Sequence, residues 1–279
     1  MEEFTIVPST IIVSNNCLND DIYILKDLPS PINISTISVS GHFSTCIILE
    51  NVSKYIVLKF DDIISVKYSR KIRSLDNQVY KKPLNLRCFI NQLIIILKIN
   101  NNKKINIKLF KNGAFQMTGC KSIDDCNKVL QKLILYLSNK IIINNNSEQI
   151  EKYFIEDIST EFSILNFKID MINSNFKINY KLNRNIFYEI LRQEGITCRY
   201  EPCIHASINI KYNTGVKIVS IFVFQSGNII ITGACCRIDI IKTYDYINSI
   251  LTKHYSKIVK RNLMLLFNDD DINDIMSEL

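Results

Sequence analysis

The residues best suited to metal or nucleophilic chemistry are four cysteines and one histidine in the C-terminal half of the chain. They are Cys198, Cys203, His205, Cys235 and Cys236. Structural zinc sites use four such ligands in closely spaced pairs, and no Cys-x-x-Cys pair occurs among the nine cysteines. Cysteine–histidine catalysis needs a third group to orient the histidine, and the carboxylates show no spaced pair for acid–base work. We therefore expect no catalytic activity, no metal site and no cofactor.

Two phenylalanines occupy matching positions in a repeated motif. Phe110–Cys120 reads FKNGAFQMTGC, and Phe224–Ala234, 114 residues later, reads FQSGNIIITGA. Gly113 and Gly227 suit a tight turn between two strands, where glycine adopts positive φ at little cost. Each copy leads into a helical pattern, over 122–138 and 237–258. A unit repeated at this distance predicts a duplicated domain with pseudo-twofold symmetry.

The strands next to these turns show a period of two, which assigns the phenylalanines to a polar face. In residues 105–110 the aliphatic side chains alternate with Asn106, Lys108 and Phe110, and alternate residues of a strand point to opposite faces. The second copy places further residues on the corresponding face, and the strands after both turns add to it. These are Ser220, Phe222 and Phe224, then Gln116 and Thr118, and Ile230 and Thr232. Either another element covers this face or the face is a binding surface.

Charge and hydropathy favour an anionic partner and no membrane. The chain has 34 basic and 27 acidic residues, a net charge of +7. Residues 262–279 hold five acids and no base, so the rest of the chain carries +12. This balance favours a polyanion such as nucleic acid. The N-terminus shows no signal peptide and the apolar runs have strand length, so we expect a soluble, intracellular protein with reduced cysteines.

The chain order predicts five segments. Residues 1–30 form an N-terminal extension, 31–140 the first repeat, 141–160 an Asn-rich linker, 161–261 the second repeat and 262–279 an acidic tail. Ile64–Tyr68 matches Ile196–Tyr200 in residue type, yet lies 18 residues farther from its motif phenylalanine. The first repeat thus carries a basic insertion near 69–86, which reads as a surface loop.

Helix signals place one short and one long helix in each repeat. Ser122 and Asp125 form a capping pattern, followed by an apolar stripe at helical spacing. Asn183 is a candidate N-cap for a helix that ends at Gly195, and a weaker pattern suggests a helix over 52–58. Each repeat therefore reads strand, helix, several antiparallel strands, helix.

These motifs together resemble the TATA-binding protein family. Tyr200–Pro202, Phe224–Gly227 and Thr232–Ala234 resemble its second repeat; Ser35–Ile37, Phe110–Gly113 and Met117–Lys121 resemble its first. The match covers about residues 31–260 and is nearest to the divergent factors of large nucleocytoplasmic DNA viruses. The resemblance implies an α+β saddle with two pseudo-symmetric repeats and a curved ten-stranded antiparallel sheet. In this family the helices cover the convex face, DNA binds the concave face, and phenylalanine wedges kink a widened minor groove.

The resemblance also assigns roles to single residues. Phe110 and Phe224 become wedges, and the second wedge of each repeat falls on Phe89 and His205. Lys98 and Lys211 take the approximate places of phosphate-binding arginines. Met171 and Asn173 align with a central Asn and Val of the family's second repeat. The first-repeat counterpart is Ile32, Asn33 or Ile34. The residues placed against base edges and sugars are Gln116, Thr118, Ser220, Phe222, Ile230 and Thr232. The polar Lys108, Asn106 and Gln116 fit either weakened insertion or an altered DNA preference.

Two functions from different classes follow from the resemblance. The first is a transcription initiation factor that binds and bends A/T-rich promoter DNA, with a IIB-like factor and a multisubunit RNA polymerase as partners. The IIB-like factor would bind near Glu201, Cys203 and Ile204. The alternative is a protein-interaction platform within a transcription complex, without strong DNA binding of its own. The implied location is the nucleus or a cytoplasmic viral factory.

Overall fold

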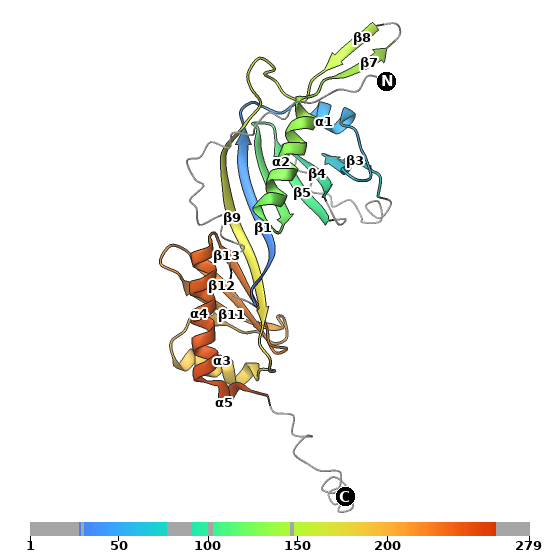
Figure 1. Ribbon diagram of the computed structural model, residues 1–279. Coiled ribbons are helices and arrows are strands. Elements are labelled where there is room, and N and C mark those ends of the chain that lie inside the picture. The colour runs from blue at the N-terminus through green and yellow to red at the C-terminus, as the bar shows by residue number, and fades with distance from the viewer. Residues whose placement is uncertain (1–27, 29–30, 77–90, 100–102, 146–147, 261–279) are drawn as a thin grey trace, which may run out of the picture. The chain divides into compact units, whose positions relative to one another are not determined.

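The computed structural model describes Leu28 and residues 31–76, 91–99, 103–145 and 148–260. Most of the expected N-terminal extension, most of the basic insertion and the whole acidic tail lie outside these residues. The chain divides into two compact units (Figure 1). Unit 1 contains Ile34–Ile172 and Cys235–Arg237; unit 2 contains Leu28–Asn33, Asn173–Ala234 and the chain from Ile238 onward. The strand Ile164–Lys177 contributes its first part to unit 1 and its last part to unit 2.

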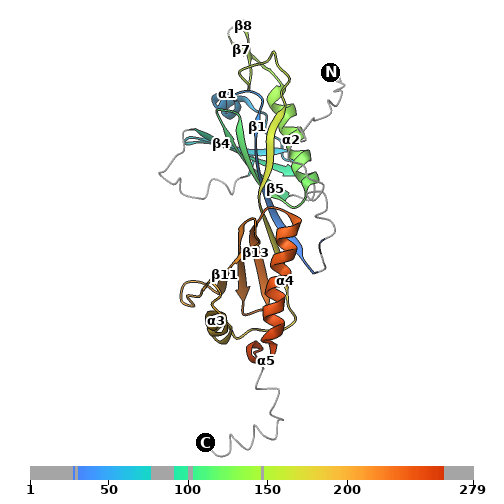
Figure 2. The same ribbon diagram turned by 90° about the vertical axis from the view of Figure 1, so that its left-hand side faces the viewer.

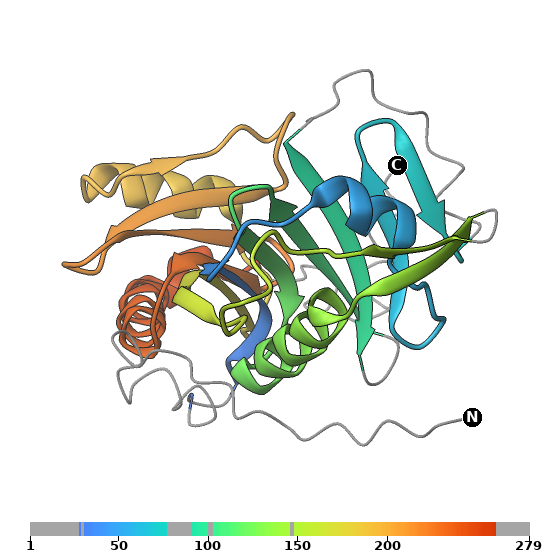
Figure 3. The same ribbon diagram turned by 90° about the horizontal axis from the view of Figure 1, so that it is seen from above.

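Unit 1 is a twisted sheet with one long helix. Its strands follow the order β3-β2-β4-β5-β6-β1-β9, and the pairs with defined register are antiparallel. Helix α2 contacts β4 and β6 and lies along one face of this sheet (Figures 1 and 3). The elements are β1 (Asn33–Phe43), α1 (Leu49–Tyr55), β2 (Ile63–Tyr68), β3 (Lys71–Ser74), β4 (Gln92–Ile99), β5 (Lys103–Phe110), β6 (Ala114–Cys120), α2 (Ile123–Ser138), β7 (Ile141–Asn145), β8 (Glu148–Lys152) and β9 (Ile164–Lys177).

Unit 2 repeats this plan with fewer strands. Its strand order is β9-β13-β12-β11-β10, and helix α4 lies along β13 (Figures 1 and 2). The helix is fixed by ring contacts, because Tyr244 meets Phe176 at 4.8 Å and Tyr246 stacks on Tyr212 at 4.0 Å between ring centroids. The elements are α3 (Arg184–Gln193), β10 (Cys198–Arg199), β11 (Ser207–Asn213), β12 (Ile218–Phe224), β13 (Asn228–Ala234), α4 (Arg237–Lys253) and α5 (Tyr255–Ile258).

Backbone hydrogen bonds show that the two units are copies of one plan. The amide of Phe43 donates to the carbonyl of Gly113 at 2.9 Å, and the amide of Ile178 donates to that of Gly227 at 3.0 Å. Each element of unit 2 except α5 therefore has a counterpart in unit 1: β9 matches β1, α3 matches α1, β10 matches β2, β11 to β13 match β4 to β6, and α4 matches α2. The duplication predicted from the motif is present in the fold, and the α+β class is confirmed.

The sheet order contains eleven strands within the described residues, one more than the ten expected. The additional strand is β3, which has no counterpart in unit 2. It comes from the basic insertion, so this part of the insertion is an edge strand paired with β2 rather than a loop. Arg73 of β3 holds it in place by donating to the carbonyls of Ser53 at 2.9 Å and Ile56 at 2.7 Å, at the end of α1. Lysine and arginine are common on edge strands, where charge hinders further pairing.

The core lies between the aliphatic face of each sheet and its helix. In β5 and β6 the buried residues alternate with partly exposed ones, and β12 and β13 show the same pattern. The Ser122 side chain accepts the Asp125 amide at 3.1 Å, which confirms the N-cap of α2. The predicted stripe of α2 is buried, as expected for an amphipathic helix: Ile123, Cys126, Leu130, Leu133 and Leu137.

Three segments differ from the sequence-based expectation. The helical pattern over 237–258 forms two helices, because α4 ends at Lys253 and a separate α5 follows, with Tyr255 51% exposed. The expected linker contains a hairpin of β7 and β8. Helix α1 begins at Leu49, three residues before the pattern suggested, because Ile47 pairs with Ile155 and ends the extended stretch there.

Candidate nucleic-acid interface

The face of each sheet that carries the motif phenylalanines is partly exposed, and we call it the open face. In unit 1 it includes Phe110, Lys108 and Asn106 of β5 and Gln116 and Thr118 of β6, all half-buried. In unit 2 the half-buried residues at the matching positions are Phe224, Phe222 and Ser220 of β12 and Ile230 and Thr232 of β13. The face assignments made from the period of two are therefore correct at these ten positions.

Phe110 and Phe224 are held at the ends of rigid hairpin turns. Each is the last residue of its strand, and its carbonyl accepts the amide of the turn glycine, at 3.1 Å from Gly113 and 3.0 Å from Gly227. Both glycines have positive φ, 84° and 85°. A Cβ atom on either would lie 2.6 Å from a backbone carbonyl oxygen, so the two turns pack tightly against the rest of their unit. The backbone that carries each phenylalanine ring is therefore held in a fixed position at the open face.

The centre of the open face differs chemically between the units. In unit 1 the register aligns Lys67, Ile94, Lys108 and Gln116 across four strands. Lys108 Nζ donates to Gln116 Oε1 at 3.4 Å. At the matching positions, unit 2 aligns Arg199, Asn209, Phe222 and Ile230. A hydrogen-bonded cation–amide pair in unit 1 thus replaces the ring and branched chain of unit 2.

Lys98 and Lys211 both lie on the open face but not at matching positions. Phe110 pairs with Gln92 and Phe224 pairs with Ser207, so Lys211 corresponds to Ile96 and Lys98 to Asn213. Lys98 Nζ lies 3.8 Å from Asp61, and Lys211 Nζ donates to Ser220 Oγ at 2.5 Å. Lys104, next to Lys98 in the register, pairs with Asp76 at 2.7 Å. On the open face of unit 1, Lys98 and Lys104 thus lie opposite each other on β4 and β5, each beside a carboxylate.

Asn173 belongs to the open face of unit 2, where its Oδ1 accepts the hydroxyl of Thr232 at 2.5 Å. Thr118 matches Thr232, and Thr118 pairs with Ser38. Counting back from the matched Phe43 and Ile178 also assigns Ser38 to the position of Asn173. The first-repeat counterpart is therefore Ser38 and none of Ile32, Asn33 or Ile34. The sequence alignment failed because the serine-rich β1 offers several similar registers.

His205 and the expected partner-binding residues lie together in the segment 200–206, which we call the edge loop. The carbonyl of Glu201 accepts the amides of Ile204 at 2.9 Å and His205 at 2.8 Å, and Ile204 is 69% exposed. Arg184 of α3 fastens this loop by donating to the carbonyl of Ala206 and lying 5.5 Å from the centre of the Tyr200 ring. Glu201 and Cys203 are exposed as well, whereas Phe89 lies outside the described residues.

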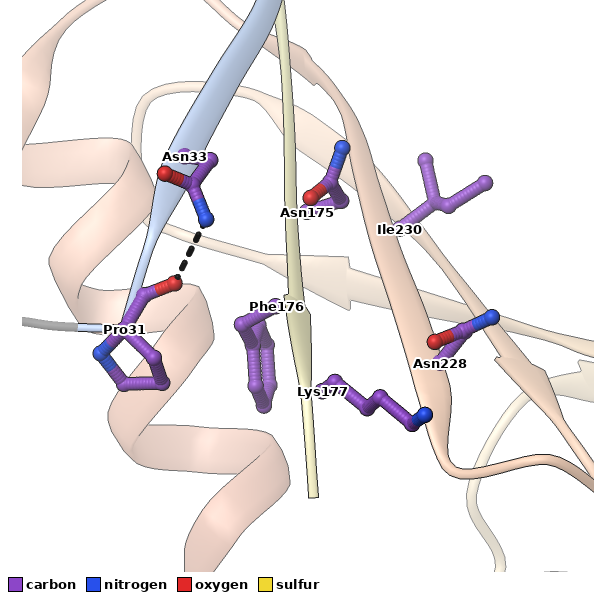
Figure 4. A pocket seen from close by; sticks show the side chains of 7 residues that line it. All are labelled: Pro31, Asn33, Asn175, Phe176, Lys177, Asn228 and Ile230. Atoms are coloured by element: carbon purple, nitrogen blue, oxygen red, sulfur yellow. Dashed lines mark hydrogen bonds between the residues drawn. The ribbon is translucent and has the colours of Figure 1, made fainter. Parts of the chain in front are cut away.

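Two hollows adjoin the open face of unit 2. One, of about 190 Å³, is lined by Arg199, Glu201, His205, Ser207, Asn209 and Phe222. The other, of about 370 Å³, is lined by Pro31, Asn33, Asn175, Phe176, Lys177, Asn228 and Ile230. Figure 4 shows the second hollow, in which Asn33 Nδ2 donates to the carbonyl of Pro31 at 3.1 Å and Lys177 extends toward Asn228.

The sequence reasoning missed two amides of this second hollow, although signals for both were present. Asn175 lies two residues after Asn173, on the same face of β9, and Asn228 directly follows the turn glycine. Asn33 contributes from the first residue of β1. Asparagine amides and lysine are side chains that hydrogen-bond to nucleic-acid bases and phosphates.

Two cysteines of the cysteine–histidine group lie in surroundings that do not activate a thiol. Cys235 Sγ donates to the carbonyl of Asp170 at 3.2 Å, and burial raises the pKa of the Cys198 thiol, which makes it a poorer nucleophile. Among the described residues, no three His, Cys, Asp or Glu side chains are grouped so as to hold a metal ion. In the same residues, no helix has both the length and the apolar character needed to cross a bilayer.

Comparison with known proteins identifies the fold. No protein-family model matches the chain. The solved structure of Methanococcus jannaschii TBP matches with a TM-score of 0.52 at 18% identity, covering 80% of this chain and 98% of that one. The fold is therefore that of the TATA-binding proteins, a class defined by the duplicated α+β unit described above.

Sequence similarity then identifies the family. The TATA-box-binding protein-like protein of Acanthamoeba polyphaga mimivirus is 38% identical over 259 residues, which cover 84% of this chain and 70% of the viral protein. The chain belongs to the family of TATA-box-binding protein-like proteins.

Proposed function

We propose that this protein is a transcription initiation factor that binds A/T-rich double-stranded DNA through the open faces of its two units and bends it. It acts as a binding protein and not as an enzyme. The observation that carries the proposal is the matched pair Phe110 and Phe224, half-exposed at the ends of rigid turns on corresponding faces. Rings presented in this way can enter a base step and partly unstack it.

Electrostatics support the same function. The net charge is +7, and Lys67, Lys98, Lys104 and Lys108 lie on the open face of unit 1. Unit 2 adds Arg199 and Lys211 at its outer strands. Cations around a polar and aromatic centre are the arrangement that neutralises phosphates while base edges face the sheet.

We further propose that the edge loop binds a IIB-like transcription factor. Glu201, Cys203 and Ile204 are exposed, and Arg184 holds the loop in a defined conformation. A fixed loop with one exposed aliphatic side chain and one carboxylate suits a small protein contact with an apolar centre. Through this factor the protein recruits a multisubunit RNA polymerase, in the nucleus or in a viral factory.

A binding assay on fluorescent A/T-rich duplexes at low salt tests the proposal. The wild-type protein should bind, and Phe110→Ala with Phe224→Ala should weaken binding about thirtyfold or more, because each stacked ring contributes about 1–3 kcal/mol. Leu135→Ala, which shortens an exposed apolar side chain of α2, is the matched control and should change nothing.

The alternative, an interaction platform without DNA binding, is favoured by one observation, the replacement of apolar by polar groups at Lys108 and Gln116. It predicts that the wild-type protein binds no duplex at any salt concentration. In that case the DNA-binding proposal is wrong.

A further inference from the structure

We propose that Lys108 and Gln116 make unit 1 a hydrogen-bonding reader of minor-groove base acceptors, whereas the matching positions of unit 2 contact the DNA by packing. The inference rests on the proposed DNA binding and extends it to a specificity determinant. It assigns different tasks to two surfaces that descend from the same repeat, and it gives the protein one preferred orientation on an asymmetric site.

The first step is the set of hydrogen-bonding groups that the pair presents. Lysine has three donors and no acceptor, and the glutamine amide has one acceptor oxygen and two donors. Because Lys108 Nζ donates to Gln116 Oε1 at 3.4 Å, one of the two lone pairs of the amide oxygen is already used. The remaining groups, on the ammonium and on the amide nitrogen, are donors. The pair therefore offers donors to a ligand on the open face.

The second step is the position of the pair in the sheet. Lys108 lies two residues before Phe110 in β5, so the two side chains share a face. Gln116 lies opposite Lys108 on the neighbouring strand β6. Beyond Gln116, the register places Ser40, whose hydroxyl donates to Asp170 Oδ1 at 2.8 Å. Beyond Lys108 it places Ile94, which has no polar group. The donors of the pair therefore lie on the open face of unit 1, next to the position of Phe110.

The third step is the chemistry of the minor groove. An A·T pair shows only acceptors there, adenine N3 and thymine O2, whereas a G·C pair adds the donor amino group of guanine. A pair in which donors outnumber acceptors is complementary to the first pattern. A/T-rich minor grooves also carry enhanced negative potential, which attracts an inserted lysine. The ammonium of Lys108 therefore has both the charge and the hydrogen-bonding character for this groove.

The fourth step is the contrast with unit 2. The matching positions hold Phe222 and Ile230, which are half-buried and have no hydrogen-bonding side-chain group. At these two positions unit 2 offers base edges only shape and apolar area. Removal of the acceptor atom that faces this position should therefore weaken binding under unit 1 and not at the equivalent base under unit 2.

The test uses duplexes in which single adenines are replaced by 3-deazaadenine, which lacks the N3 acceptor. When the substitution is scanned across the site, the wild-type protein should lose about tenfold to a hundredfold in affinity at one or two positions of one half, with no equal loss at the equivalent positions of the other half; this is the value of one hydrogen bond from a charged group. Lys108→Met keeps the side-chain length and should abolish this sensitivity, even though its overall affinity is lower.

Lys104→Met is the matched control, because it removes the same charge from the same face of β5. It should weaken binding through the loss of charge and keep the 3-deazaadenine effect. Thermal melting of both variants verifies that the fold is retained. Equal losses in both halves, no loss anywhere, or an unchanged loss in Lys108→Met would each overturn the inference while DNA binding itself stands. Absence of wild-type binding to every duplex would instead overturn the proposed function, and the inference with it.

Discussion

Side-chain direction along β5 and β12 explains why single residues of the open face could be assigned from the sequence. The alternation in 105–110 and in 219–224 is unbroken, so Phe110 and Phe224 had to share a face with lysine, amide and hydroxyl groups. Strand β1 lacks such a signal, because serines and aliphatic residues follow one another with a register shift between Ile37 and Ser38. The match of Ser38 to Asn173 consequently needed backbone hydrogen bonds.

The N-cap of α2 is a residue whose contribution can be measured directly. Ser122 Oγ accepts the Asp125 amide at 3.1 Å. Ser122→Ala leaves this amide without its partner and should lower the free energy of unfolding by about 1 kcal/mol. Chemical denaturation checks this value. Gln131→Ala, at an exposed position in the middle of the same helix, is the control and should remain within about 0.5 kcal/mol of wild type.

Asp125 should make the stability of the protein depend on acid pH. Burial by itself raises the pKa of Asp125, but the hydrogen bond and charge of Lys103 and the amides of Lys121 and Ser122 outweigh burial and lower this pKa below its usual value. Lys103 Nζ lies 2.6 Å from Asp125 Oδ2. A carboxylate with a lowered folded-state pKa stabilises fully above its unfolded pKa of about 3.9 and loses that contribution as the pH falls through the folded value.

Asp125→Asn tests this sign. Asparagine keeps an acceptor oxygen but does not titrate, so the variant should be less stable than wild type at pH 7. Between pH 5 and 2 the wild type should then lose more unfolding free energy than the variant. Two unfolding curves that fall in parallel over this range would show that Asp125 is not the titrating group.

At the scale of elements, the hairpin turn is what fixes each phenylalanine. Its glycine was identifiable because the motif places it between two strand patterns. The sequence did not reveal that a second backbone segment approaches each turn closely, at Thr45 for Gly113 and at Tyr180 for Gly227. Sequence patterns report the local conformation of a turn but not which distant carbonyl packs against it.

Glycine replacements separate these two effects. Gly215 and Gly227 both have positive φ, 94° and 85°, but an added Cβ meets nothing within 4 Å at Gly215 and lies 2.6 Å from the Tyr180 oxygen at Gly227. Gly215→Ala should cost about 1 kcal/mol from backbone strain alone. Gly227→Ala should cost at least about 1 kcal/mol more, since the carbonyl must move. Equal costs in denaturant unfolding would contradict the tight packing of the turn.

The basic insertion shows why one element was not predicted. Residues 69–76 are rich in lysine, arginine and serine, which favours a loop when read locally. In the fold, Lys71–Ser74 pairs with β2 and Arg73 reaches the end of α1. Pairing with an existing edge supplies the backbone hydrogen bonds, so weak strand propensity was overridden by tertiary context.

At the scale of the whole molecule, the duplicated plan was predictable because the motif, its spacing and the following helix recur together. The fold follows from those repeats, and the comparison with Methanococcus jannaschii TBP agrees. The eleventh strand and the hairpin of β7 and β8 were not predictable, since neither has a copy in the other repeat. A repeated sequence predicts the elements that both copies share, but it does not predict an element that only one copy contains.

The proposed function makes affinity for DNA dependent on salt. Each lysine that contacts a phosphate releases counterions, so Lys98→Met and Lys211→Met should each reduce the slope of log K against log salt by about 1. Lys257→Met, on the exposed surface of α5, is the control and should leave the slope unchanged. Binding measured between low and moderate salt gives these slopes, and slopes equal to wild type would remove both lysines from the phosphate contacts.

Bending of the duplex tests the central claim most directly, because bending is what two wedges on a sheet accomplish. An A/T-rich duplex labelled at its two ends should show increased energy transfer when saturated with the wild-type protein. With Phe110→Ala and Phe224→Ala at a saturating concentration, the duplex should be bound but remain close to straight. If the wild-type complex keeps the end-to-end distance of free DNA, or if the double variant bends the duplex as well as the wild type does, the two rings are not wedges.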